Sequence, residues 1–309
     1  MSLGRIAKFA WFVVAYNVAV VLYGAVVRAT GSGAGCGSNW PDCNGGALPL
    51  TGTAEELIEF GHRATSGLAL IFVAVLVVWV FRTRPAGDLV RKPAAAAGAL
   101  IIVEALFGAM LVLFEWVGDD QSNGRAISIT LHLVVTFLLL GSLALTAWWL
   151  SGGRAPQRPL HPRDRTLFSL AFGGLMLVGA AGAITALGDT LFPAESLLEG
   201  IRDDFTGAFL VRLRWIHPVV AIAVSALILY LVANRRPTAG PGIRLADGLT
   251  ALVVVQLIAG VVNVILLAPV WMQVVHLLLA DLMWIGFVLY ASETLAEPAR
   301  VETPETVGS

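Results

Sequence analysis

Residues 126–150, AISITLHLVVTFLLLGSLALTAWWL, decide the fold class of this chain. A transmembrane helix needs about 20 predominantly apolar residues, and this stretch exceeds that length with His132 as its one ionisable side chain. Seven further apolar windows lie at about 7–27, 61–81, 94–117, 167–187, 213–234, 245–267 and 271–293. Their lengths, and the charged or turn-forming residues between them, predict eight transmembrane helices.

The composition of the 309-residue chain agrees with this prediction. Hydrophobic residues make up 57% and charged residues 13%, and the mean hydropathy is +0.81. An ordinary soluble domain carries roughly 25% charged residues, so this chain has too few to cover its surface in water. The composition excludes a soluble globular enzyme, a disordered chain and a nucleic-acid-binding protein, and it indicates membrane lipid as the solvent.

The distribution of cations predicts the orientation in the membrane. With the N-terminus inside, 14 of the 20 lysines and arginines fall on the inner side. The six on the outer side are Arg28, Arg63, Arg125, Arg202, Arg212 and Arg214. By the positive-inside rule, we expect a multi-pass protein of the cell (inner) membrane with both termini cytoplasmic. We also expect a short amphipathic helix around residues 194–201, in the third outer loop.

Internal similarity predicts two copies of a four-helix unit. EALFG at 104–108 matches QLIAG at 256–260, His132 matches His276 in the next span, and Gly24 is paired with Gly179. Each half holds an even number of spans, so the repeat is parallel. We therefore expect an all-α membrane protein built from two parallel-repeat four-helix bundles. Residues 1–150 form the first half, 151–296 the second, and 297–309 a disordered cytoplasmic tail.

Four histidines stand in corresponding places of the two halves. They are His62, His132, His217 and His276, and we expect each within the first two turns at the outer end of its helix. A single intramembrane histidine often only bonds helices together, but two pairs at one depth fit the axial ligands of two haem irons. Zinc or copper would usually take a third or fourth protein ligand. The pattern predicts one haem site per half.

The two halves differ beside these histidines. Glu59 precedes His62 by three positions, on the same helical face, whereas Arg214 stands in that place before His217. Glu59 is interpreted either as a charge favourable to the helix N-terminus or as a proton-accepting carboxylate beside a reacting macrocycle. We expect the half with the carboxylate to carry the chemistry.

The outer arginines and the two cysteines are further candidates. Arg28, Arg63, Arg212 and Arg214 could each bind a haem propionate or anchor a helix at the interface. Cys36 and Cys43 lie in a glycine-rich outer loop, where an oxidising compartment favours a disulfide. That disulfide is either a structural staple or a redox-active bond.

These residues resemble the haem A synthase family. The resemblance lies in RATGSGAGCGSNWPDCNG at 28–45, EFGHR at 59–63, LHL at 131–133, His217, and QVVHL at 273–277. It covers all eight spans, and the cysteine loop followed by Glu59 and His62 is its specific part.

The resemblance implies oxidation of the C8 methyl of haem O to a formyl group, which gives haem A for cytochrome oxidase. Two hydroxylations would pass through an alcohol and a gem-diol. It implies that His62 and His132 hold the substrate haem, that His217 and His276 hold haem b, and that Glu59 is catalytic. Haem O synthase and cytochrome oxidase assembly proteins are implied partners, and a quinone is a candidate electron acceptor.

Other functions compete with this interpretation. They are a di-haem quinone oxidoreductase, a haem-binding or haem-transport protein without chemistry, and a haem-free transporter. Histidines near one face argue against a transmembrane electron wire, and Glu59 without a counterpart in the second half argues against simple haem binding.

Overall fold

The computed structural model describes residues 4–46, 52–156, 160–207, 209–237 and 240–296. Eight helices in it are long and apolar enough to cross a membrane. They are α1 (Arg5–Ala29), α2 (Ala54–Thr83), α3 (Arg91–Leu113), α4 (Asn123–Leu150), α5 (Pro162–Leu191), α8 (Ile216–Asn234), α9 (Pro241–Ile265) and α10 (Val270–Thr294). The described residues form no strand. The prediction of an all-α protein with eight membrane spans is confirmed.

The helix boundaries differ from the apolar windows where capping residues extend or stop a helix. α2 begins at Ala54 because the side chain of Thr53 accepts a hydrogen bond from the backbone N–H of Glu56. α3 ends at Leu113, short of the predicted residue 117, and Glu115 then adopts a positive φ of 57°. Hydropathy marks the apolar length of a span, whereas local hydrogen bonds decide where the helix ends.

The outer loops carry the remaining short helices. The 3-10 turn η1 spans Ser32–Ala34, α6 spans Leu197–Thr206, and α7 spans Phe209–Arg212. The amphipathic helix predicted at 194–201 exists as α6, but it is shifted towards the C-terminus. The shift follows from Ser196, whose side chain caps the helix by accepting from the N–H of Glu199 at 3.3 Å.

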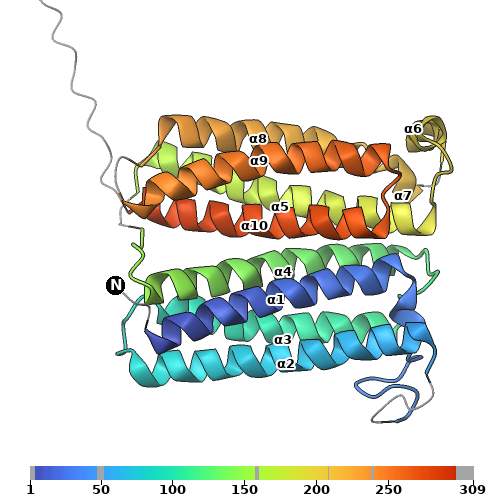
Figure 1. Ribbon diagram of the computed structural model, residues 1–309, viewed down its shortest axis with the longest axis horizontal. Coiled ribbons are helices and arrows are strands. Elements are labelled where there is room, and N and C mark those ends of the chain that lie inside the picture. Colours follow the sequence, from blue (N-terminus) through green and yellow to red (C-terminus); the bar gives the residue numbers. More distant parts are fainter. Residues whose placement is uncertain (1–3, 47–51, 157–159, 208, 238–239, 297–309) are drawn as a thin grey trace, which may run out of the picture.

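The long helices lie in two groups (Figure 1). α1–α4 form one group and α5, α8, α9 and α10 form the other, and α1 and α4 contact α10 where the groups meet. Trp284 of α10 stacks on Phe137 of α4 with ring centres 5.8 Å apart and donates to its carbonyl oxygen at 2.5 Å. The parallel repeat and the domain boundaries after residues 150 and 296 stay predictions.

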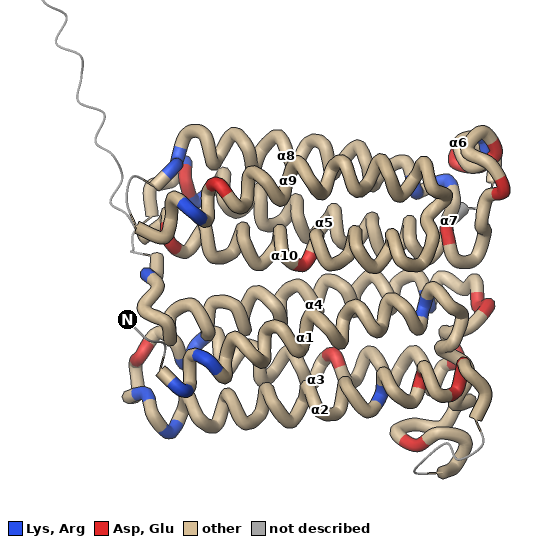
Figure 2. Tube along the Cα trace, viewed as in Figure 1, with Lys and Arg blue, Asp and Glu red and all other residues tan. Residues whose placement is uncertain are grey.

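Charge is sorted between the two ends of the bundle. Figure 2 shows basic residues gathered at the end where the chain begins and most acidic residues at the end that carries α6 and the cysteine loop. The first helix begins, and α10 ends, at the basic end. Many large apolar side chains between the two ends are exposed, as expected of a surface that lipid covers. Cytoplasmic termini stay a prediction, and the predicted tail at 297–309 lies outside the described residues.

The basic end also joins the two groups. Glu293 of α10 is fully buried and accepts from the indole N–H of Trp148 at 2.9 Å. It also accepts from the backbone N–H and the Nε of Arg154, at 2.7 and 2.8 Å. Arg154 belongs to the linker that follows α4, so this carboxylate holds the connection between the groups against α10.

Candidate functional site

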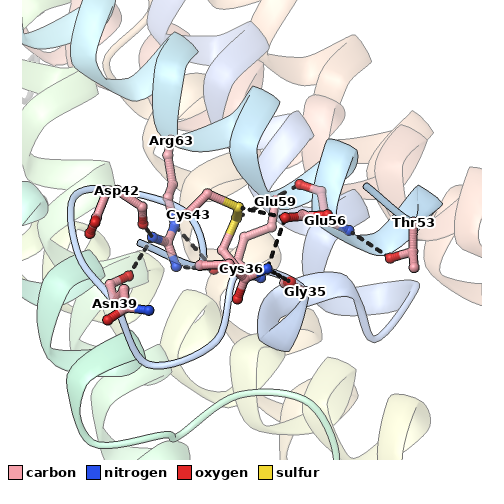
Figure 3. The surroundings of a disulfide bond; sticks show 10 residues. Gly35, Cys36, Asn39, Asp42, Cys43, Thr53, Glu56, Glu59 and Arg63 are labelled. Carbon is pink, nitrogen blue, oxygen red and sulfur yellow. Dashed lines mark hydrogen bonds and ion pairs between the residues drawn. A yellow bond between two sulfur atoms is a disulfide. The ribbon is translucent and has the colours of Figure 1, made fainter. Parts of the chain in front are cut away.

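Glu59 lies buried in the second turn of α2, against the loop that follows α1 (Figure 3). Its Oε2 accepts from the backbone N–H of Cys36 at 2.8 Å, and its Oε1 accepts from Nη2 of Arg63 at 2.5 Å. Arg63 also donates to the carbonyl oxygens of Asn39 and Asp42, both at 2.6 Å. Glu59 and Arg63 therefore hold the cysteine loop on the outer end of α2.

The two cysteines meet within this loop. Their sulfur atoms lie 2.01 Å apart, which is disulfide-bonding distance, and their Cα atoms 4.5 Å apart. Glu56 lies beside them: its Oε1 accepts from Asn44 at 2.8 Å and is 3.6 Å from Sγ of Cys43. The sequence reasoning missed Glu56, although Thr53-x-x-Glu56 is the pattern of a capping box. Here the glutamate binds the loop.

His62 follows Glu59 by about one turn and faces α1. The ring of Tyr23 meets it edge-on at 5.7 Å between centres, and Gly24 lies against its ring. A Cβ atom on Gly24 would come within 3.0 Å of Cε1 of His62. The Nδ1 atom of His62 is buried and has no hydrogen-bond partner among the described residues. Because Gly24 has no side chain, α1 leaves room for this imidazole.

His132 lies on α4 and is held by α3. Its Nδ1 is 2.8 Å from Oε2 of Glu104, and Oε1 of Glu104 accepts from the hydroxyl of Thr136 at 3.1 Å. His132 is also close enough to His62 for the two to interact electrostatically. The bond from Thr136 to Glu104 joins α4 to α3.

The second half brings His217 and His276 together. Their ring centres are 6.3 Å apart and the ring planes are at 83°. Nδ1 of His217 is 3.1 Å from the carbonyl oxygen of Val178, and Nε2 of His276 is 3.4 Å from Nε2 of Gln256.

Glycines again lie against these rings. A Cβ atom on Gly182 would meet His217 at 3.0 Å, and one on Gly260 would meet His276 at 3.2 Å. Both distances are to Cε1 of the imidazole. Each of the two second-half histidines therefore depends on the missing side chain of a glycine on a neighbouring helix.

The geometry of His217 and His276 fits the two sides of a haem iron. A nitrogen ligand lies about 2 Å from a transition metal, so two imidazoles on opposite sides of one metal have ring centres roughly 6 Å apart once the ring radius is added. The 6.3 Å between His217 and His276 agrees with that separation. Val178 occupies the Nδ1 side of His217, which leaves Nε2 for a metal.

Three of the four arginines considered for propionates have protein partners. Arg63 binds Glu59 and the cysteine loop, and Arg214 binds Asp189 at 2.8 Å and Asp204 at 3.0 Å. Arg212 is exposed at the end of α7, and within the described parts of the chain it has no hydrogen bond or ion pair.

Arg28 reaches from α1 into the second half. Its Nη1 donates to the carbonyl of Ala186 at 2.5 Å and to Thr190 at 2.7 Å, and its Nη2 donates to Gln273 at 2.8 Å. Gln273 stands one turn before His276 on α10. Arg28 thus connects the outer ends of the two halves.

Two sequence predictions are wrong in detail. His62 and His132 lie in the third turns of their helices, because α2 and α4 begin at the polar caps Thr53 and Ser122, ahead of the apolar windows. Gly179, which was paired with Gly24, faces Phe137. Gly182, one turn later on α5, is the glycine that lies against a histidine.

Comparison with known proteins adds independent information. The model of the COX15-CtaA family, described as a cytochrome oxidase assembly protein, matches residues 7–288. A protein of Thermus thermophilus named protoheme IX farnesyltransferase is 49% identical over 97% of this chain, which spans only 50% of that relative's length.

Proteins named heme A synthase are also similar to this chain. That of Shouchella clausii is 30% identical over 69% of this chain and 70% of its own length. That of Lysinibacillus sphaericus is 44% identical over 43% of this chain and 44% of its own length.

Proposed function

Because the chain belongs to the COX15-CtaA family of cytochrome oxidase assembly proteins, we propose that it is a haem A synthase. In this function it is an oxidoreductase that converts the C8 methyl group of haem O to a formyl group by two successive hydroxylations. The product, haem A, serves cytochrome oxidase. The relative from Shouchella clausii supports this proposal, because its similarity extends over about two thirds of both chains.

The name of the Thermus relative fits the same proposal. That protein is about twice as long as the segment matched by this chain, so its name describes more than this chain contains. We propose that farnesyl transfer belongs to the unmatched half and that this chain acts on the farnesylated haem. A haem O synthase is then the partner that supplies the substrate.

The four histidines divide between two haems in this proposal. His62 and His132 hold the substrate, and His217 and His276 hold haem b, which supplies one-electron transfer when it is bound. Support comes from the 6.3 Å between the second pair of rings and from the glycines that leave room beside three of the histidines. Arg212, exposed at the outer end, is the arginine best placed to bind a propionate without giving up a protein partner.

The burial of Glu59 beside His62 is the observation that carries the proposal. Glu59 is a buried carboxylate one turn before His62, and the second half has Arg214 in that place. The N–H of Cys36 and the guanidinium of Arg63 hold the carboxylate in one orientation. We propose that Glu59 is the catalytic residue, and that it stabilises cationic character at the methyl carbon or accepts its proton.

The eight apolar helices belong to a multi-pass membrane protein. We propose that it resides in the cell (inner) membrane with both termini cytoplasmic. The cysteine loop, α6 and α7 then lie outside, at the end that carries most of the acidic residues. An oxidising compartment at that face maintains the disulfide between Cys36 and Cys43.

The test is to purify Glu59→Gln protein made with a haem O supply and to identify its haems by extraction and chromatography. We expect haem b and haem O to be present and haem A to be absent. Glu55→Gln is the matched control, because Glu55 lies one turn earlier on α2 and is exposed. Normal haem A formation by the Glu59 variant would contradict the proposed role.

The same extraction from unmutated protein separates the competing functions. Haem b together with haem A formed from the supplied haem O supports the synthase. Haem b alone, with and without a haem O supply, favours a quinone oxidoreductase, and bound haem O that is never oxidised favours a haem carrier. Conversion of haem b to a farnesylated haem by this chain would contradict the proposal that farnesyl transfer belongs to the unmatched half of the Thermus relative.

A further inference from the structure

Glu104 is a carboxylate in the membrane-spanning part of α3, and α4 binds both of its oxygen atoms. Oε2 lies 2.8 Å from Nδ1 of His132, and Oε1 accepts from the hydroxyl of Thr136 at 3.1 Å. The side chain of Glu104 is only 12% exposed. A carboxylate at this depth is costly unless it is paired, so its contacts with one face of α4 call for an explanation.

The other three histidines have different surroundings. His217 has the neutral carbonyl oxygen of Val178 at its Nδ1, at 3.1 Å. The Nδ1 atoms of His62, His132 and His276 make no hydrogen bond of good geometry within the described parts of the chain, but that of His132 lies 2.8 Å from a carboxylate oxygen. Gln256 stands at the repeat position of Glu104, but it is an uncharged amide and lies near Nε2 of His276 at 3.4 Å. Among the four histidines, His132 is the one with a carboxylate at Nδ1.

The physical consequence follows from the chemistry of imidazole. A carboxylate oxygen close to Nδ1 favours the tautomer that carries its proton on Nδ1 and the ring orientation that keeps the proton near the carboxylate, so that Nε2 is free for a metal. It also makes the imidazole a more basic ligand than a neutral carbonyl oxygen does. A more basic axial ligand stabilises ferric over ferrous iron, which lowers the reduction potential.

We propose that Glu104 is a positioning residue that orients His132 and lowers the reduction potential of the iron bound in the first half. This inference rests on the proposed function, since it requires a haem at His132. It adds a redox difference between two sites with the same ligand set. The carboxylate partner belongs to the half that contains Glu59, so ligand tuning and the proposed catalytic residue occur in the same half.

A purely structural role for Glu104 makes a different prediction. If the carboxylate only clamped α3 to α4, its bond to Thr136 would serve that purpose as well as its contact with His132. Thr136→Val removes the hydroxyl and leaves the contact with His132, so it is the matched control. Glu104→Gln keeps the shape and a hydrogen-bond acceptor but removes the negative charge.

The experiment is an anaerobic redox titration of the purified full-length protein, loaded with haem O and followed by its visible spectrum. The iron of the first half is assigned as the signal lost in His132→Ala. In Glu104→Gln we expect its ratio of reduced to oxidised iron, at a fixed potential, to rise about tenfold, which corresponds to about 59 mV for one electron. The iron of the second half should not change, and Thr136→Val should leave both potentials at the unmutated values.

Each outcome decides for or against the proposal. Selective loss of the first-half haem in Glu104→Gln, with the second-half haem retained and with no such loss in Thr136→Val, also supports it. An unchanged first-half potential, an equal shift in Thr136→Val, or a change in both halves overturns it. If unmutated protein shows no haem signal that depends on His132, the proposed function itself fails, and that result is distinguishable because it does not involve Glu104.

Discussion

Replacing single glycines by alanine should disturb individual haem sites, one at a time. Gly24, Gly182 and Gly260 lie against His62, His217 and His276, and a Cβ atom at these positions would come within 3.0, 3.0 and 3.2 Å of a histidine carbon. Ordinary contacts of a Cβ atom lie at 3.4–4 Å. One added methyl group therefore forces the imidazole to move by a few tenths of an ångström.

The energetic consequence can be estimated for the bound haem. Turning a side chain about 30° from its preferred rotamer costs on the order of 1 kcal/mol, and 1.4 kcal/mol is a factor of ten in binding. We expect about fivefold weaker haem retention at the affected site. Helix propensity acts in the opposite direction, because alanine stabilises a helix interior by up to about 1 kcal/mol relative to glycine. Thermal stability should therefore be maintained or raised while haem affinity falls.

The assay is haem content per protein after purification, with haem b and haem O separated by chromatography. Gly24→Ala should lower the haem O fraction, and Gly182→Ala and Gly260→Ala should lower haem b. Gly108→Ala is the control, because a Cβ atom there has no neighbour within 4 Å. Equal haem loss in Gly24→Ala and Gly108→Ala would refute the reasoning, because the effect would then not depend on contact with a histidine.

Three further substitutions test the contacts that hold the molecule together. Arg28→Lys keeps the charge, but a lysine cannot bind Ala186, Thr190 and Gln273 together, so we expect the free energy of unfolding to fall by about 2 kcal/mol and the thermal midpoint in detergent to fall with it. An unchanged midpoint would show that these contacts are dispensable. Glu293→Ala removes the carboxylate that accepts from the indole N–H of Trp148 and from the backbone N–H of Arg154, which should cost about 3 kcal/mol. Chemical denaturation with an unaltered midpoint would exclude this role. Cys36→Ser removes the disulfide to Cys43, which closes a loop with a sequence separation of 7 and contributes about 2.4 kcal/mol through loop entropy, so amide hydrogen exchange around residues 36–46 should become faster. Unchanged exchange there would show that Glu59 and Arg63 order the loop without the disulfide.

Much of the fold could be predicted because the membrane restricts what an apolar segment can do. The backbone of each long apolar window must satisfy its hydrogen bonds internally in lipid, which leaves the helix as the solution. The ends of α2, α3 and α6 were misplaced because Thr53, Glu115 and Ser196 act through local hydrogen bonds or backbone angles that hydropathy does not register. The errors are confined to residues at the polar ends of the spans.

The candidate site was predictable as a set of residues but not as a set of contacts. Glu59 and His62 share one helix, so their spacing alone places them on one face. The partner of Arg63 could be read from the same helix, but its bonds to the carbonyl oxygens of Asn39 and Asp42 depend on how the loop folds back. Arg28 could be expected at a propionate, whereas the structure places it between the two halves.

The sequence by itself determined the eight spans, their polarity of charge and the four histidines, because these follow from the length, composition and spacing of single segments. The tertiary structure decided what each histidine meets: Glu104 at His132, Val178 at His217, and a glycine at each of the other two. Such contacts join residues on different helices, and they depend on the rotation and height of each helix against its neighbours. Side-chain packing sets those two quantities, and no periodicity along one segment contains them.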